Sequence, residues 1–221
     1  MTSREIWNNL YKDRTIAKSI PIFYFLRFKP GMSFLDVGCG SGFHLQYLRK
    51  KFYAECYGVD IVLHSGSEKK NYNFVIADAS NLPFKDNVFD IVFSFGTIEH
   101  TTRTFECVRE SFRVLKHGGQ VAHTVPNLFS LHSLFARPLL KGLKMWRLGL
   151  ERSFTRAQFH KLFQEAGFKS IKCCLIPFNT QVHSKQFSTF GKGLHLFKTL
   201  DNIIMKLMPF WGFFIAMYGI K

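Results

Sequence analysis

The sequence predicts an α/β domain in which helices cover both faces of a mainly parallel sheet. Short apolar runs typical of buried strands alternate along the chain with helical or crossover segments, which is the pattern of parallel strands. The first run leads into a glycine-rich turn and then a helix. The chain has 221 residues, 47% hydrophobic and 20% charged, so it can bury one core of its own. This composition excludes a disordered tail, a collagen-like fibre and a disulfide-stapled miniprotein.

The expected elements follow from the pattern of apolar residues and from glycine as a helix and strand terminator. The first strand, 34–37, ends in the turn Gly38-Cys39-Gly40-Ser41-Gly42, and apolar residues at 43, 45, 47 and 48 then indicate a helix. Further strands are expected at 55–59, 73–77, 89–94 and 120–125, with a helix at 103–115. The last third is expected to contain a helix at 155–166, a strand at 169–176, a helix at 194–208 and a strand at 213–220.

The cysteines and the apolar stretches indicate the cellular setting. The 5 cysteines form neither a CxxC pair nor a zinc-spaced set, and the N-terminus lacks a signal-peptide pattern. We therefore expect a reduced, cytoplasmic protein. The longest apolar stretches, 19–28 and 203–220, contain proline and basic residues, whereas a membrane span needs about 20 mostly apolar residues. No linker or repeat divides the chain, so we expect a single domain over 1–221.

Positive charge is concentrated in the second half of the chain. Residues 1–100 carry 12 basic and 10 acidic side chains, whereas residues 101–221 carry 18 and 5. The formal net charge of +15 therefore comes almost entirely from the second half. An anionic surface would meet that half of the protein.

The glycine turn and three carboxylates indicate a nucleoside site. Glycines without Cβ atoms let a ligand approach the backbone amides at a helix N-terminus. Phe43 stands where a dinucleotide fingerprint needs glycine, which argues against a dinucleotide. Asp36, Asp60 and Asp78 lie at or near the ends of the first three strands, and so share one sheet edge. Carboxylates without basic neighbours suit an adenosine rather than a pyrophosphate.

Five ordered motifs resemble the class I S-adenosylmethionine-dependent methyltransferases, of methyltransferase type 11. They are Phe34–Gly42, Asp60, the run Ala77-Asp78-Ala79-Ser80-Asn81-Leu82-Pro83-Phe84, the run Phe89–Ser94 and the run Arg113–Gly119. The resemblance covers about residues 30–126. It implies a Rossmann-like three-layer sandwich whose seven-stranded sheet has the order 3-2-1-4-5-7-6 and an antiparallel last strand. It also implies S-adenosyl-L-methionine as the cofactor.

The resemblance implies a cofactor role for residues that match the family's motifs. Asp36 would lie near the methionine moiety, and Gly38, Cys39, Gly40 and Gly42 would follow the cofactor. Asp60 would bind the ribose hydroxyls, Asp78 and Ala79 the adenine, and Ser94 would lie beside the methionine end. Only twelve residues separate Asp60 from Asn73, so the usual second crossover helix must be very short. We therefore expect Ile61 or Val62 to cover one adenine face.

The acceptor side is less defined by the sequence. His100 follows the fourth strand and is our candidate general base, with a structural or adenine-side role as the alternative. Tyr11 and His132 are candidate substrate contacts, with packing as the alternative for Tyr11. His44 is a weaker candidate base, and His123 is expected to be a core residue. No metal site is expected.

The segment 137–150 is predicted to form a basic amphipathic helix. Arg137, Lys141 and Lys144 fall roughly opposite an apolar stripe that contains Leu139 and Trp146. Such a helix can lie on a membrane surface or can be a lid packed on its own core. We divide the domain into an N-terminal helical cap (1–29), a cofactor-binding core (30–126), an acceptor-side insertion or lid (127–154) and a closing unit (155–221).

The function expected from these features is methyl transfer to a small or lipid-linked acceptor, at oxygen rather than carbon or nitrogen, with peripheral contact to the inner membrane face. Two alternatives stay open. One is an RNA or other polyanion methyltransferase that uses the basic half for phosphate contacts. The other is a non-catalytic scaffold with a methyltransferase fold.

Overall fold

The structure is a computed structural model that describes residues 25–63, 72–146, 148–176, 199–200, 203–204, 207–208 and 211–221. Its centre is a seven-stranded sheet with the order β3-β2-β1-β4-β5-β7-β6, in which β7 is antiparallel to both of its neighbours. The strands are β1 (Ser33–Val37), β2 (Glu55–Asp60), β3 (Asn73–Ile76), β4 (Phe89–Phe95), β5 (Leu115–Pro126), β6 (Lys169–Ile176) and β7 (Phe214–Ile220). The predicted α/β fold and strand order are confirmed.

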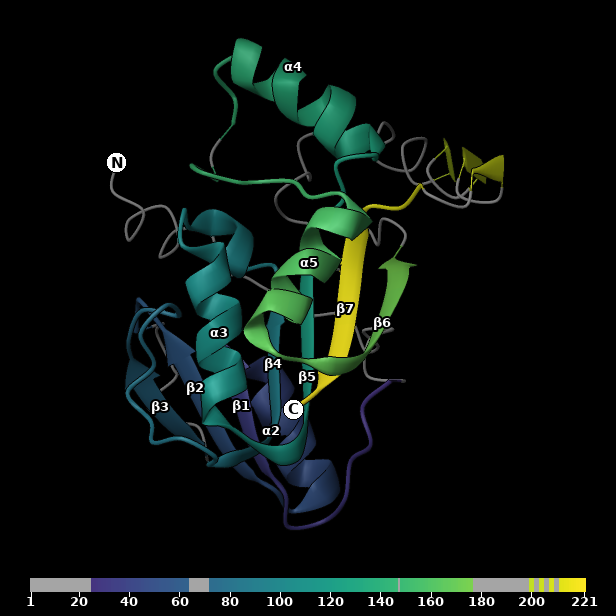
Figure 1. The fold of residues 1–221 in the computed structure, drawn as a ribbon. Coiled ribbons are helices and arrows are strands. Elements are labelled where there is room, and N and C mark those ends of the chain that lie inside the picture. The colour runs from purple at the N-terminus through teal and green to yellow at the C-terminus, as the bar shows by residue number, and fades with distance from the viewer. Residues whose placement is uncertain are drawn as a thin grey trace.

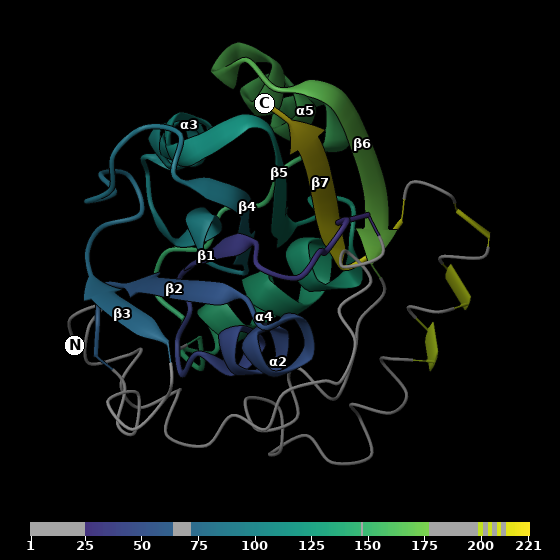
Figure 2. The same ribbon diagram turned by 90° about the horizontal axis from the view of Figure 1, so that it is seen from below.

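Helices cover the two faces of the sheet. The helices α3 (Thr104–Val114) and α5 (Arg156–Ala166) lie on one face, and α2 (Phe43–Phe52) lies on the other (Figure 1 and Figure 2). Two short elements, η3 (Ile98–His100) and the π-helix η4 (His132–Ala136), follow β4 and β5, and η4 continues into α4 (Arg137–Gly142). Figure 1 shows α4 beyond the carboxyl ends of the parallel strands, which is the edge where ligands bind in open α/β sheets.

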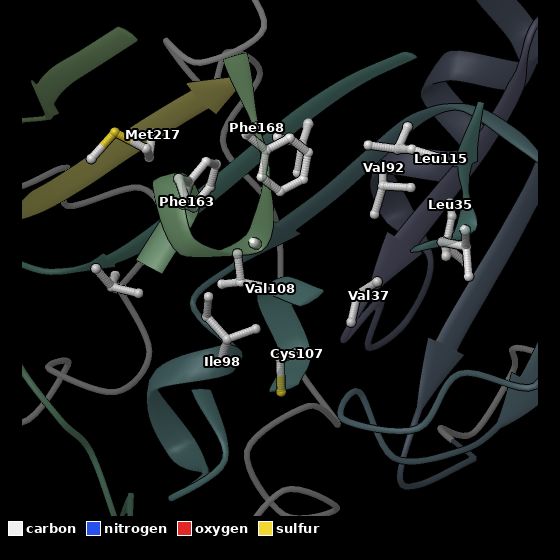
Figure 3. Packing of buried hydrophobic residues seen from close by; sticks show 14 of the residues in the cluster. Leu35, Val37, Val92, Ile98, Cys107, Val108, Leu115, Phe163, Phe168 and Met217 are labelled. Carbon is white, nitrogen blue, oxygen red and sulfur yellow. The ribbon is translucent and has the colours of Figure 1, made fainter. Parts of the chain in front are cut away.

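Successive side chains of a strand point to opposite faces of the sheet, so alternate residues fill two separate cores. On the side of α3 and α5, Leu35 and Val92 pack against Val108 and Phe163, and Figure 3 shows this cluster. On the side of α2, Phe34 and Ile91 from the strands share the second core with Leu45 of the helix. Because β1 is buried along its whole length, its alternation also turns the Asp36 carboxylate toward α2.

The predicted boundaries hold within a few residues, with one clear exception. The helix expected over 137–150 ends at Gly142, and Lys144 takes a left-handed φ of 56°. Glycine is a poor helix former, and the left-handed residue turns the chain away from the helical path. The Trp146 indole then donates to the Gly149 carbonyl over 2.9 Å instead of extending an apolar stripe.

Several predictions fall wholly or partly on other parts of the chain. The N-terminal cap up to residue 24, most of the crossover between β2 and β3, and most of the helix expected at 194–208 lie outside the described residues. Of that last helix, residues 199–200, 203–204 and 207–208 are described, and all of these except 208 are helical. The five cysteines are all free thiols.

Candidate cofactor site

A cleft of about 240 Å³ opens at the carboxyl ends of the central strands. It is lined by Gly38, Val59, Asp60, Ile61, Ala77, Asp78, Ala79, Gly96, Thr97, His100 and Thr101. These residues come from the segments that follow β1, β2, β3 and β4, so the cleft straddles the point where strand order reverses between β1 and β4. This is where a doubly wound sheet binds its ligand.

The glycine turn after β1 is fixed to the end of β2 by its backbone. The amides of Gly38 and Cys39 donate to the Val59 carbonyl over 2.7 and 3.0 Å. Gly38 has a φ of +80°, and a Cβ there would lie 2.1 Å from the Thr97 hydroxyl oxygen. A side chain at this position is therefore excluded twice, by the backbone conformation and by the close approach of the loop after β4.

Asp60 orients the same turn and faces the cleft. Its Oδ2 accepts from the Gly40 amide over 2.9 Å, and its Oδ1 accepts from the Val62 amide over 3.3 Å. A carboxylate offers about four acceptor positions, so these two bonds fix its orientation and leave capacity for ligand donors. Asp60 is 9% exposed, at the cleft wall.

Asp78 is held in a tight turn after β3. Its Oδ1 accepts from both the amide and the hydroxyl of Ser80, each over 2.8 Å. The neighbouring Ala79 lines the cleft beside it. Ile61, which is 45% exposed, also lines the cleft, whereas Val62 is buried. Of the two alternatives for covering an adenine face, the geometry favours Ile61.

A polar network behind the cleft holds the Asp78 loop against α3. The Arg113 guanidinium donates to the carbonyls of Leu82 and Phe84 over 2.9 and 2.7 Å, and to the carboxylates of Asp86 and Glu110 over 2.8 Å. The Leu82 amide donates to Glu110 over 2.8 Å. Hydrogen bonds from Arg113 lower the pKa of Glu110 against its partial burial. The two motifs at 82–84 and 113–119 therefore meet in one structural network.

Asp36 lies below the turn rather than in the cleft lining. It is 2% exposed, and its Oδ2 is 3.5 Å from Nδ1 of His44, at the start of α2. Burial raises the pKa of Asp36, while the His44 imidazole acts in the opposite direction. Gly42, which caps α2 with a φ of 71°, is covered by Tyr72, since a Cβ there would lie 1.9 Å from the phenol oxygen.

The structure therefore brings half of the predicted cofactor residues to the cleft. Gly38, Asp60, Ile61, Asp78 and Ala79 line it, and Gly40 supports Asp60. Cys39 and Ser94 are buried, at 7% and 0% exposure, and neither is a lining residue. The Ser94 hydroxyl has no hydrogen-bond partner within the described ranges.

Of the candidate acceptor residues, too, some line the cleft and others do not. His100 lines the cleft, and its Nδ1 lies 2.5 Å from the Leu150 carbonyl. His132 does not line it: the ring is 4% exposed and its Nε2 lies 2.8 Å from Glu151. His123 is a fully buried core residue, as expected, and burial lowers its pKa to about 3. Tyr11 lies outside the described residues.

Sequence reasoning missed the contribution of the loop after β4. Gly96, Thr97 and Thr101 line the cleft together with His100. Small and hydroxyl residues carry no spacing signature, so no motif marked them. They follow β4, the strand that lies next to β1 where the strand order reverses, and ligands bind at this point of such a sheet. That position is the signal that could have identified them.

The chemistry of the lining fits S-adenosyl-L-methionine. Two carboxylates match the hydroxyl and amine donors of an adenosine, and the glycine wall admits a close approach of the ligand. Among the described residues, no lysine or arginine lines the cleft, so nothing there would balance a pyrophosphate. No group of three or more potential metal-ligating side chains occurs in the same part of the chain.

Comparison with known proteins agrees with this chemistry. Residues 35–123 match the family model of a methyltransferase domain. These residues include the glycine turn, both cleft carboxylates and the loop after β4. The chain contains a class I S-adenosylmethionine-dependent methyltransferase domain. S-adenosyl-L-methionine is the cofactor of this domain family.

Two curated relatives from Arabidopsis thaliana share the methyltransferase domain with this chain. Phosphoethanolamine N-methyltransferase 3 is 33% identical over 107 residues, which are 45% of this chain and 22% of that protein. The chloroplastic tocopherol O-methyltransferase is 35% identical over 97 residues, which are 39% of this chain and 28% of that protein. The matched region is thus less than a third of either relative's length.

A solved structure extends the likeness to the whole fold. Phosphoethanolamine N-methyltransferase 2 of Haemonchus contortus, in complex with S-adenosyl-L-methionine, superposes with a TM-score of 0.69 at 18% identity. The superposition covers 100% of this chain and 57% of that one. At this identity the likeness concerns the fold, and the strand order of the methyltransferase domain agrees with it.

Proposed function

We propose that the protein transfers a methyl group from S-adenosyl-L-methionine to a hydroxyl oxygen of a small or lipid-linked acceptor at a membrane surface. The observation that carries the cofactor part is the cleft. Asp60, Asp78 and the loop after β4 line it together, and no lysine or arginine is among its described lining residues. When bound, the cofactor supplies a methyl group on a sulfonium, which is already activated for transfer.

The residues of the protein bind the acceptor, align it with the methyl group and accept its proton. Catalysis of this kind consists largely of holding the acceptor in line with the reacting group. A base is needed only when the acceptor must lose a proton, as a hydroxyl must. His100 is the imidazole of the cleft lining, and we assign it the role of general base. A base in this place suits a hydroxyl acceptor, which must release its proton on methylation.

Exposed apolar side chains in and around α4, at the same end of the sheet as the cleft (Figure 1), support a lipid-linked acceptor. Phe135, Leu139 and Leu143 follow one another at intervals of four residues and are 63%, 63% and 58% exposed. Phe135 lies in the π-helix η4, Leu139 in α4, and Leu143 directly after the last residue of α4. Because η4 continues into α4, this spacing places the three side chains along roughly the same side of one continuous segment. Exposed apolar side chains that gather in this way are typical of surfaces that contact a membrane or a partner. We call these three residues the apolar row.

The cations near the apolar row support contact with an anionic membrane. Lys141 and Lys144 are exposed, and a basic residue near an anionic surface contributes about 1 kcal/mol. Arg137, expected to join them, is instead 13% exposed and paired with Glu151, so it is not available to lipid headgroups. Within the described ranges, no helix is long and apolar enough to cross a bilayer. We propose that the contact is peripheral and on the inner face of the membrane.

The test is transfer of labelled methyl from S-adenosyl-L-methionine into a fractionated extract of the source cell. We expect label in the organic-soluble pool, sensitive to His100→Gln. Label only in the aqueous small-molecule pool would overturn the lipid-linked acceptor. Label in RNA, with steep salt dependence, would instead support a polyanion methyltransferase that uses the basic half of the chain. Absence of transfer together with absence of S-adenosylhomocysteine binding would support a non-catalytic scaffold.

A further inference from the structure

The three residues Leu150, Glu151 and Arg152 connect the cleft to the 127–154 segment. The Leu150 carbonyl lies 2.5 Å from Nδ1 of His100. The Arg152 amide donates to the Glu99 carbonyl over 3.0 Å, and the Arg152 guanidinium reaches the Thr102 carbonyl at 3.2 Å. The residues on both sides of Glu151 are therefore bonded to η3 and its following turn, which carry His100.

Glu151 itself points the other way and is the centre of a buried ionic cluster. Its carboxylate is 6% exposed, with Oε1 at 2.8 Å from Nε2 of His132 and 3.2 Å from the Arg137 guanidinium. The same guanidinium donates to the Glu151 carbonyl over 3.1 Å. Burial on its own would raise the pKa of Glu151, but His132, His100 and Arg137 lower it below its usual value. The carboxylate is thus ionised and held from two sides.

The bond to Leu150 fixes the tautomer of His100. A carbonyl oxygen can only accept a hydrogen bond, so Nδ1 must carry the proton. The neutral ring then has its lone pair on Nε2, the nitrogen that lies 3.8 Å from the Glu99 carboxylate. A general base needs its lone pair on a defined nitrogen, and the partner of the other nitrogen decides which one that is.

We propose that Glu151 is a positioning residue that fixes the Leu150 carbonyl on His100 and so keeps the His100 lone pair on Nε2. This inference rests on the proposed function and specifies how its base is prepared. Glu151 is not among the residues that line the cleft. It acts through the Leu150–Arg152 backbone: its buried ion pairs to His132 and Arg137 anchor that backbone to η4 and the start of α4. The anchored backbone in turn places Leu150 and Arg152 against His100 and Glu99 of η3.

A purely structural role for Glu151 makes a different prediction. If the cluster only stabilised the fold, its loss would lower the free energy of unfolding without changing the His100 tautomer in the folded protein. If it positions His100, the folded variant would show a changed tautomer. The His100 ring nitrogens therefore discriminate the two roles.

The test is nitrogen-15 NMR of the His100 ring, assigned with His100→Gln, in the full chain at a pH where the ring is neutral. We expect the Nδ1–H tautomer to dominate in the wild type and to become the minor species in Glu151→Gln. Methyl transfer should fall by about tenfold or more, as for other outer partners of functional histidines. The dissociation constant for S-adenosylhomocysteine should change less than about twofold, since Glu151 lies outside the cleft lining.

The matched control is Glu165→Gln, which removes an exposed carboxylate paired with Lys161 on α5. It should leave the His100 spectrum unchanged. If Glu151→Gln does not fold, His132→Gln opens the cluster from its other side and should shift the tautomer in the same direction. A wild-type spectrum without the Nδ1–H form, or a folded Glu151→Gln that keeps it, would overturn the proposal. Because this spectrum needs no cofactor, failure of the proposed function would be seen separately, as wild-type protein that neither binds S-adenosylhomocysteine nor transfers methyl.

Discussion

Asp60 joins the glycine turn to the cleft, since one carboxylate both accepts from the Gly40 amide and faces the ligand space. Asp60→Asn keeps the shape but removes the charge that strengthens hydrogen bonds to ligand hydroxyls. A hydrogen bond to a charged group contributes about 1.5–3 kcal/mol, so we expect S-adenosylhomocysteine to bind at least about tenfold more weakly by calorimetry. Glu55→Gln, an exposed acid at the other end of β2, is the control and should bind as the wild type. Equal affinities for both variants would contradict the assignment of Asp60.

His123 makes the fold sensitive to acid. Its folded pKa is lowered from 6.5 to about 3 by burial, and neither ring nitrogen has a hydrogen-bond partner within the described ranges. As the pH falls from 6.5 to 3, the unfolded chain therefore binds a proton at this position that the folded chain does not. The free energy of unfolding should fall through this window by up to about 1.4 kcal/mol per pH unit from this group.

His123→Leu tests this by urea titrations at several pH values. It should flatten the pH dependence between 6.5 and 3, whereas His117→Leu, at an exposed position, should not. An unchanged slope in His123→Leu would show that other groups cause the acid sensitivity.

At the scale of elements, Arg113 ties α3 to the loop that carries Asp78. Arg113→Met removes its bonds to two carbonyls and two carboxylates, and leaves buried acceptors such as the Leu82 carbonyl without their donor. We expect the free energy of unfolding to fall by about 2–4 kcal/mol and S-adenosylhomocysteine binding to weaken, because Asp78 loses its support. Arg109→Met, an exposed position on the same helix, is the control. A variant as stable as the control would show that the network contributes nothing.

The sequence predicts regular elements well where burial is periodic. β1 and β4 alternate between the two cores, so their apolar runs mark them, and the Thr155 capping box and Gly167 mark both ends of α5. The helix expected over 137–150 was wrong beyond Gly142, because the spacing of apolar and basic residues does not reveal that Lys144 adopts a left-handed conformation. The spacing also does not reveal that the Trp146 ring packs on His132.

The candidate site also has a part that the sequence predicts and a part that it does not. Asp60 and Asp78 are predictable because strand ends collect at one sheet edge, and the structure brings both to one cleft. The pairing of Arg137 with Glu151 is not predictable, since it joins residues 14 apart across an irregular segment. That pairing removed Arg137 from the expected basic face and made it part of the support of His100.

At the scale of the whole molecule, α4, which carries Leu139 of the apolar row, lies beyond the carboxyl ends of the parallel strands (Figure 1). The residues that line the cleft follow the same strand ends. Leu139→Glu with Leu143→Glu puts two anions in the row and should abolish cosedimentation with vesicles that contain phosphatidylserine. Activity on a soluble acceptor should remain. Tyr53→Glu, an 86% exposed aromatic at the end of α2, is the control and should still cosediment. Vesicle binding that survives the double change would rule out the apolar row as the contact.

The lining of the cleft suits an adenosine-bearing sulfonium or thioether and not a dinucleotide. The most direct measurement is calorimetric titration of the full chain with S-adenosylhomocysteine and, separately, with NAD at the same concentrations. We expect saturable one-to-one binding of S-adenosylhomocysteine and no measurable heat from NAD, since the described lining offers two carboxylates and no lysine or arginine for a pyrophosphate. Binding of NAD with similar affinity, or no binding of S-adenosylhomocysteine, would contradict this expectation.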